Sequence, residues 1–111
     1  MNRTQLLRKL VKQAERMIQT GFSQTLRTCG TPSCGCHSDP TKKHGPHTYV
    51  SFRTEEGKSS GMYVPVEHVD EVQRARQTWK EFGETAKELA ALNRKQMQQS
   101  WRAAGKAKVR R

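Results

Sequence analysis

One stretch, residues 28–47, constrains the fold of this chain more than any other. Its sequence is TCGTPSCGCHSDPTKKHGPH, and it contains all three cysteines of the protein and three of its four histidines. Three glycines and three prolines interrupt it, so it is neither a long helix nor a regular strand. A loop of this length inside a compact domain needs something to hold it, and this one has almost no apolar residues. We therefore predict that a metal ion fixes the loop.

The spacing of the sulfur and imidazole side chains suits zinc. Zinc prefers four tetrahedral ligands, and three thiolates with one imidazole form a closed structural site. The predicted ligands, in the pattern C-x4-C-x-C-x7-H, are Cys29, Cys34, Cys36 and His44. His37 and His47 compete for the fourth position, and His44 is preferred because the turn at Gly45 and Pro46 pins its backbone. Free, reduced structural cysteines are the alternative to metal binding.

The loop lacks the groups that catalysis requires. A zinc with an open fourth position would be catalytic, but no Glu or Asp is placed beside the ligands to act as base. Asp39 is the only carboxylate in the loop, and we expect it to cap the turn before Pro40. The chain has no CxxC motif, and Cys34 and Cys36 are too tightly spaced for an easy disulfide. We therefore expect a protein that is not an enzyme and has Zn²⁺ as its cofactor.

The cysteine usage and the N-terminal sequence favour the cytoplasm. MNRTQLLRKLVKQ has no uninterrupted apolar region followed by a small-residue cleavage site. No stretch approaches the roughly 20 apolar residues that a membrane helix needs. In the cytoplasm, cysteines stay reduced, and clustered cysteines bind metal more often than they pair. No membrane partner is expected.

Before the loop, residues 3–20 are predicted to form an amphipathic helix. Asn2 is placed to cap its N-terminus with Gln5 in a capping box, and Gly21 follows as the residue after the helix. The basic residues on the other faces suit a membrane or a nucleic acid, but such a helix more often packs on a core. The apolar stripe consists of Leu6, Leu7, Leu10, Val11, Ala14, Met17 and Ile18.

After the loop, residues 48–64 are predicted to form a two-stranded hairpin with a four-residue turn. Alternate side chains face opposite sides, with Val50 and Phe52 on one face and Tyr49 and Tyr63 on the other. An isolated hairpin is marginally stable, so this one must pack on the metal loop or on a helix.

The longest predicted element is a helix over residues 65–104, followed by a basic tail at 105–111. Pro65 suits the first helical position. The apolar residues recur in steps of three and four, as in a heptad: Val72, Ala75, Trp79, Phe82, Ala86, Leu89 and Asn93. This pattern supports either a helical hairpin with residues 3–20 or a coiled-coil homodimer. The predicted fold is mainly α with a small β-hairpin, in a single small zinc-stabilised domain over residues 1–104.

The charge pattern favours a nucleic acid, DNA or RNA, as partner. The net charge is +11, residues 94–111 hold seven basic residues and no acid, and residues 66–93 hold six acids against four bases. The basic residues would contact phosphates without reading sequence. The predicted nucleic-acid-binding residues are Lys42, Lys43, Arg53, Lys58, Arg94, Lys95, Trp101, Arg102, Lys106, Lys108, Arg110 and Arg111. Trp101 is either a stacking residue for a base or a packing anchor. The alternative function is a protein-interaction adaptor, in which the heptad helix docks a larger protein.

Three segments of the chain resemble a small prokaryotic protein family of unknown function. They are TCGTPSCGC, HGPHTYVSF and GKSSGMYVP, and they match the family pattern TCGxPxCxC…HGP…GKxxxxYVP over about residues 28–92. The resemblance implies that the family's three cysteines and its histidine fall on the four predicted ligands. His47 and Thr48 stand where the family has an aromatic pair. The family brings no activity, and its association with mobile elements implies an accessory subunit of a mobile-element or other nucleic-acid-processing complex.

Overall fold

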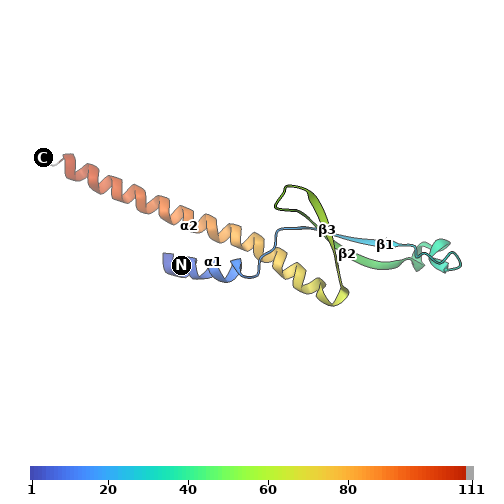
Figure 1. Cartoon of the computed structure of the whole chain (residues 1–111). Coiled ribbons are helices and arrows are strands. Elements are labelled where there is room, and N and C mark those ends of the chain that lie inside the picture. Colours follow the sequence, from blue (N-terminus) through green and yellow to red (C-terminus); the bar gives the residue numbers. More distant parts are fainter. Residues whose placement is uncertain (110–111) are drawn as a thin grey trace. The chain divides into compact units, whose positions relative to one another are not determined.

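The fold was analysed in a computed structural model, which describes residues 1–109 and the side chains of residues 1–105. The fold is mainly α, as predicted, and Figure 1 shows the course of the chain. The helices and strands in chain order are α1 (Arg3–Ala14), β1 (Gly21–Arg27), β2 (His44–Arg53), β3 (Ser59–Val64) and α2 (Val69–Val109). Neither helix within the described residues is long and apolar enough to cross a membrane.

The residues group into two compact units. One unit contains residues 1–17 and the chain from Gln77 onward, which includes α1 and most of α2. The other contains residues 18–76, which include the whole sheet, the Cys/His loop and the first turns of α2. A single domain over residues 1–104 stays a prediction.

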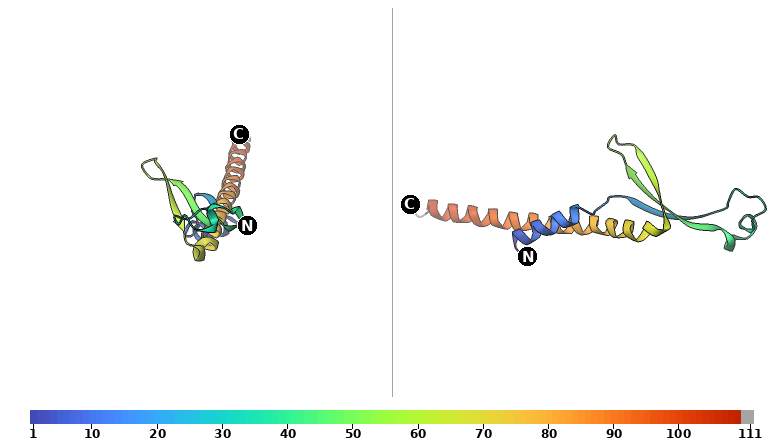
Figure 2. Two further views of the ribbon diagram at one scale, coloured as in Figure 1. Left: turned by 90° about the vertical axis from the view of Figure 1, so that its right-hand side faces the viewer. Right: turned by 60° about the horizontal axis from the view of Figure 1, so that its bottom comes forward.

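In the helical unit, α1 lies beside α2 and runs in the opposite direction (Figures 1 and 2). The predicted capping box is confirmed, because the Asn2 side chain accepts the Gln5 N–H and the Gln5 side chain accepts the Asn2 N–H, both at 2.9 Å. Leu6 of α1 and Thr85 of α2 are each only 2% exposed, so they mark the core of this unit. Other residues of the predicted stripe, such as Leu7, remain exposed.

The predicted helix over residues 3–20 is too long, because α1 ends at Ala14. Residues 15–17 still donate to Val11 and Gln13, but from Ile18 onward the chain bonds to residues far along the sequence. The Ile18 N–H donates to the Ala75 carbonyl at 3.1 Å, and the Thr20 carbonyl accepts from Arg76 Nε at 3.1 Å. These contacts with the start of α2 extend the chain toward β1 and override the apolar periodicity that continues to Ile18.

The sheet has three antiparallel strands in the order β1-β2-β3, and not the two predicted. Strand β1 is the addition, and β2 begins at His44 instead of residue 48. The predicted alternation of faces is confirmed by the register, in which Val50 pairs with Met62, and Tyr49 pairs with Tyr63.

One face of the sheet carries the core of this unit, although Met62 on strand β3 of that face is 50% exposed. Val50, Val64 and Thr48 are 1–3% exposed. Phe22 of β1 pairs with Val50, and the Arg76 guanidinium lies 5.2 Å from the Phe22 ring centroid. The packed face is therefore the Val50 face, and the Tyr49 and Tyr63 side chains lie on the other.

Helix α2 differs from its predicted bounds, 65–104, at both ends. Pro65 precedes a separate 3-10 turn (Val66–His68), and α2 itself begins at Val69. The helix continues to Val109, so the predicted tail at 105–111 is wrong over residues 105–109. One glycine costs a helix about 1 kcal/mol relative to alanine, and the alanines around Gly105 are the best helix formers. Coiled-coil pairing of this helix stays a prediction.

Candidate metal centre

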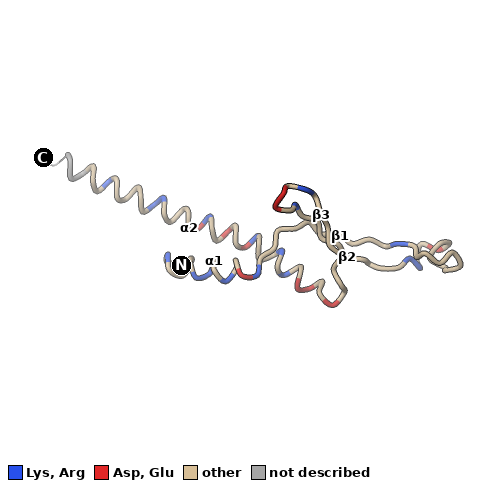
Figure 3. The backbone as a smooth tube through the Cα atoms, in the orientation of Figure 1, with Lys and Arg blue, Asp and Glu red and all other residues tan. Residues whose placement is uncertain are grey.

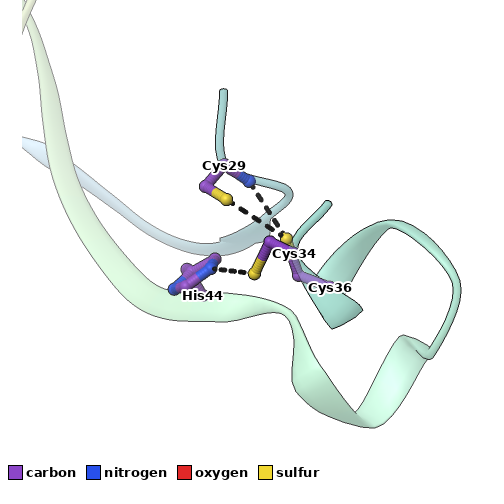
Figure 4. A group of neighbouring side chains, drawn as sticks. All are labelled: Cys29, Cys34, Cys36 and His44. Atoms are coloured by element: carbon purple, nitrogen blue, oxygen red, sulfur yellow. Dashed lines mark hydrogen bonds between the residues drawn. The ribbon is translucent and has the colours of Figure 1, made fainter. Parts of the chain in front are cut away.

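The four predicted metal ligands come together where β1 ends and β2 begins. The ligand atoms of this cluster, one from each residue, all lie within 4.8 Å of one another (Figure 4). We call it the Cys3His cluster, and its members are Cys29, Cys34, Cys36 and His44. All three cysteines are free thiols.

Two distances show how well the cluster fits a tetrahedral ion. Cys34 Sγ lies 3.4 Å from His44 Nε2, and Cys36 Sγ lies 3.5 Å from Cys29 Sγ. Bond lengths of about 2.3 Å to sulfur and about 2.0–2.1 Å to nitrogen place tetrahedral ligands about 3.8 Å (S to S) and about 3.6 Å (S to N) apart. The observed separations are close to these values and far above a disulfide bond length of about 2.05 Å. The four side chains could therefore hold a metal ion after a small adjustment.

The strand register places His44 beside the cysteines. Arg27, the last residue of β1, pairs with His44, the first residue of β2, and Cys29 follows two positions later. The register shifts between Thr25 and Arg27, so β2 has one residue more than β1 at this point. Gly45 and Pro46 lie opposite the single residue Leu26 at this point, and Gly45 has a φ of +127°, which favours glycine. A Cβ there would lie 2.8 Å from the Thr25 carbonyl oxygen, so the HGP sequence fits only with glycine in the middle.

The loop between the strands folds through two short 3-10 turns. Cys36 lies in the first (Gly35–His37) and is 1% exposed, and its sulfur accepts the Cys29 N–H at 3.3 Å. Asp39 caps the second turn, where its side chain accepts the Thr41 N–H at 3.0 Å and the Thr41 hydroxyl at 2.7 Å. The expected capping role of Asp39 is therefore confirmed, and its carboxylate is occupied within the loop.

The competing histidines, His37 and His47, have other contacts. His37 Nε2 lies 2.7 Å from the Cys29 carbonyl oxygen, which accepts its hydrogen bond and ties the ring to the backbone of a cluster residue. This hydrogen bond restrains the backbone at Cys29. His47 lies in β2, with its ring centroid 6.4 Å from that of Tyr63. The structure therefore brings only His44 into the cluster. The sequence analysis missed the hydrogen bond of His37 to the Cys29 carbonyl, which its position directly after Cys36 allows.

The local hydrogen bonds favour ionised thiols at two positions. Hydrogen bonding from the Thr31 backbone, followed by the Cys36 side chain, lowers the pKa of Cys29 to about 6. The pKa of Cys34 is lowered first by the backbone of Cys36 and then by the His44 ring. Burial raises the pKa of Cys36. The hydrogen bond between the His44 ring and the Cys34 side chain raises the pKa of His44. Thiolates are the form of cysteine that binds metals.

The predicted nucleic-acid-binding residues are distributed over both units. Lys42, Lys43, Arg53 and Lys58 belong to the sheet unit, where Lys58 Nζ lies 3.9 Å from a Glu56 carboxylate oxygen. The helical unit has four exposed members on α2: Arg94, Lys95, Trp101 and Arg102. Two more, Lys106 and Lys108, lie on α2, but their side chains are outside the described part, and Arg110 and Arg111 lie outside the described residues.

The fold and the cluster together define a class of protein, in which a Cys3His cluster closes the long loop between two strands of a small antiparallel sheet. The chain belongs to the family described as a domain of unknown function (DUF6788), whose sequence profile matches residues 3–74. This match confirms the resemblance to a family of unknown function, and it also includes α1. No curated protein and no solved structure matches the chain significantly.

Proposed function

We propose that this protein is a non-catalytic, zinc-stabilised nucleic-acid-binding protein. The metal part of the proposal is carried by the convergence of three sulfurs and one imidazole nitrogen within 4.8 Å. This soft donor set and its tetrahedral spacing suit zinc better than metals that prefer oxygen ligands. The cluster formed by the described residues contains no carboxylate.

The zinc would be structural. The loop between β1 and β2 has one buried side chain in residues 28–43, that of Cys36, so it has almost no core of its own. Four bonds to one ion would tie the end of β1, the first 3-10 turn and the start of β2 together. A catalytic zinc would need a base near an open position. The only carboxylate of the loop, Asp39, is held by Thr41 instead.

Nucleic-acid binding is supported by the distribution of charge along α2. The acids of this helix lie in the half that begins at Val69, and only basic charges follow them (Figure 3). Arg94, Lys95 and Arg102 are exposed, and no acid occurs after residue 93. A helix surface with basic residues and no acid attracts phosphates at long range and releases counterions when it binds them.

Two measurements test the proposal. Elemental analysis of the purified protein should find one zinc per chain. Binding to random single-stranded and duplex oligonucleotides should weaken steeply with salt, with a slope of about −0.9 per duplex phosphate contact in a double logarithmic plot. The double variant Lys95→Gln and Arg102→Gln should reduce the size of this slope by about 2. The matched control is Lys80→Gln with Lys87→Gln, which has the same spacing but lies in the acidic half of the helix.

The alternative, a protein-interaction adaptor, is favoured by the apolar residues that α2 exposes. Trp79, Met97 and Trp101 are 37%, 56% and 67% exposed. Large exposed apolar side chains often mark protein contacts. Lack of nucleic-acid binding even at low salt would favour this function and reject the first. A larger protein partner, such as a nucleic-acid-processing enzyme, stays a prediction in either case.

A further inference from the structure

The face of the sheet opposite the core presents a cluster of rings and positive charge. Tyr49 and Tyr63 pair directly across β2 and β3, with ring centroids 5.7 Å apart and an interplanar angle of 66°. The His47 ring lies 6.4 Å from Tyr63. The Arg27 guanidinium lies 5.1 Å from the Tyr49 ring centroid. We call these four residues the aromatic face.

The most accessible ring of this face is that of Tyr63. It is 52% exposed, whereas its neighbour Val64 on the covered face is 3% exposed. The positions beside the rings carry small residues. Ser51 of β2 pairs with Gly21 of β1 and with Gly61 of β3, next to the Tyr49–Tyr63 pair. A flat group that contacts Tyr63 would therefore meet few tall side chains around it.

The charge around this face suits a polyanion. The three strands and the segments between them, residues 21–64, contain five basic residues against three acids. Glu55 and Glu56 lie in the turn between β2 and β3, and Asp39 accepts two hydrogen bonds from Thr41 within its own turn. Arg53 follows Tyr49 and Ser51 in the alternation of β2 and so belongs to the same face as Arg27. The Arg27 guanidinium is placed to contact a phosphate, whereas Arg53 Nη1 donates to the Gly57 carbonyl at 3.3 Å within the β2–β3 turn.

We propose that the aromatic face binds unpaired bases of a single-stranded nucleic acid, with Tyr63 as the stacking platform and Arg27 as a phosphate contact. This inference rests on the proposed function and deepens it by assigning a surface and a substrate class. Stacking on aromatic side chains is the main way in which proteins hold unpaired bases. Bases inside a duplex are stacked on one another and do not offer their faces to a side chain. These rings can therefore stack on the bases of a single strand but not on those of a duplex.

The cross-strand Tyr49–Tyr63 contact also stabilises the sheet, so the test must separate stacking on a base from folding. The variant Tyr63→Thr removes the ring but keeps a residue that favours strands. The variant Tyr63→Phe keeps the ring. Met62→Thr is the matched control, because Met62 is 50% exposed on the other face of the same strand. Thermal melts establish that each variant is folded at the temperature of the binding assay.

Binding is measured by fluorescence anisotropy with labelled oligonucleotides of about 12 nucleotides, which is within the usual site size for such surfaces. The probes are oligo-dT, oligo-rU and a random DNA duplex. We expect tighter binding of a single strand than of the duplex, and about tenfold or greater loss for single strands in Tyr63→Thr. The affinities of Tyr63→Phe and Met62→Thr for single strands should stay within about threefold of wild type. The salt dependence of binding should be the same in all three variants as in wild type, because none of them removes a charge.

Three outcomes distinguish this inference from the proposed function. Preference for a single strand that is lost only in Tyr63→Thr supports both, and the tighter of the two single-stranded probes identifies DNA or RNA as the substrate. Equal binding of single strands and duplex that Tyr63→Thr leaves unchanged overturns the stacking inference but leaves salt-dependent nucleic-acid binding in place. Lack of binding to all three probes at low salt overturns both.

Discussion

Replacing Cys36 with serine removes the most deeply buried sulfur of the Cys3His cluster. Cys36 is 1% exposed, and its sulfur lies 3.5 Å from that of Cys29 and accepts the Cys29 N–H. Serine has nearly the same shape, so the packing of the surrounding turn should hardly change. The effect of Cys36→Ser therefore reports the loss of one metal ligand and not the creation of a cavity.

The expected magnitude follows from the number of ligands. Structural zinc sites in small peptides bind with an apparent free energy of about 10–16 kcal/mol, which is about 3 kcal/mol for each of four ligands. Loss of Cys36 should therefore weaken zinc binding by about 100-fold. At a fixed zinc concentration well above both dissociation constants, the free energy of unfolding of the sheet unit falls by about 2.7 kcal/mol. For a unit of this size the melting temperature should fall by about 10–20 °C.

The assay combines three measurements on wild type and Cys36→Ser. Elemental analysis gives the zinc content, competition with a chromophoric chelator gives the zinc affinity, and thermal melts at fixed zinc give the stability. The matched control is His47→Asn. It removes a histidine of the same sheet that lies outside the cluster, so zinc content and affinity should not change.

Two results would contradict the assignment of the cluster as a zinc site. If Cys36→Ser keeps one zinc per chain with an affinity within a few-fold of wild type, Cys36 is not a ligand. Wild-type protein that contains no zinc and melts cooperatively at the same temperature after chelator treatment would remove the metal from the description of the fold altogether.

Gly45→Ala places a side chain on a backbone with φ of +127° and close to the Thr25 carbonyl of β1, so it should lower the free energy of unfolding by about 2 kcal/mol and weaken zinc binding. Gly57→Ala is the control: its φ is +83° but the space around it is open, so the zinc affinity in the chelator competition assay should not change. In chelator-treated protein at pH 7, iodoacetamide should label Cys29 well before Cys36, because the pKa of Cys29 is about 6, whereas Cys36 is buried and its pKa is raised. Mass spectrometry of the peptides measures the order of labelling, and faster labelling of Cys36 would contradict the prediction. Arg76→Met removes the hydrogen bond to the Thr20 carbonyl and the cation above the Phe22 ring, so the free energy of unfolding measured with denaturant should fall by about 2 kcal/mol. An unchanged unfolding midpoint would show that neither contact stabilises the fold.

The sequence predicted the cluster well because its information is local. The three cysteines and His44 lie within 16 consecutive residues, and glycines and prolines limit the paths that the backbone between them can take. The choice of His44 over His37 and His47 came from the neighbouring Gly45, and in the structure the positive φ of that glycine accompanies the shift in register that aligns His44 with Arg27. Spacing and turn chemistry were sufficient to assemble the four side chains.

The third strand could not be predicted in the same way because it depends on distant residues. Gly21–Arg27 has only two large apolar residues, Phe22 and Leu26, of which Leu26 is 57% exposed, and its ladder partners begin at His44. The end of α1 has a similar origin, since the hydrogen bonds that draw the chain away from a helix come from Ala75 and Arg76, more than 50 residues further on. Local propensity says little about either of these elements, and only the assembled unit defines them.

The register of β1 and β2 connects the Cys3His cluster to the aromatic face. Arg27 and His44 form the last pair of the ladder, so an ion held by His44 and Cys29 would fix the end of the sheet that also carries Arg27. The Arg27 side chain in turn lies over Tyr49, which contacts Tyr63. If the aromatic face binds nucleic acid as proposed, a zinc that stabilises the loop would also determine how firmly Arg27 is held beside Tyr49 and Tyr63. In such an arrangement a structural metal contributes to binding without touching the nucleic acid, because the same strand pair that closes the metal loop supports the residues that meet the ligand.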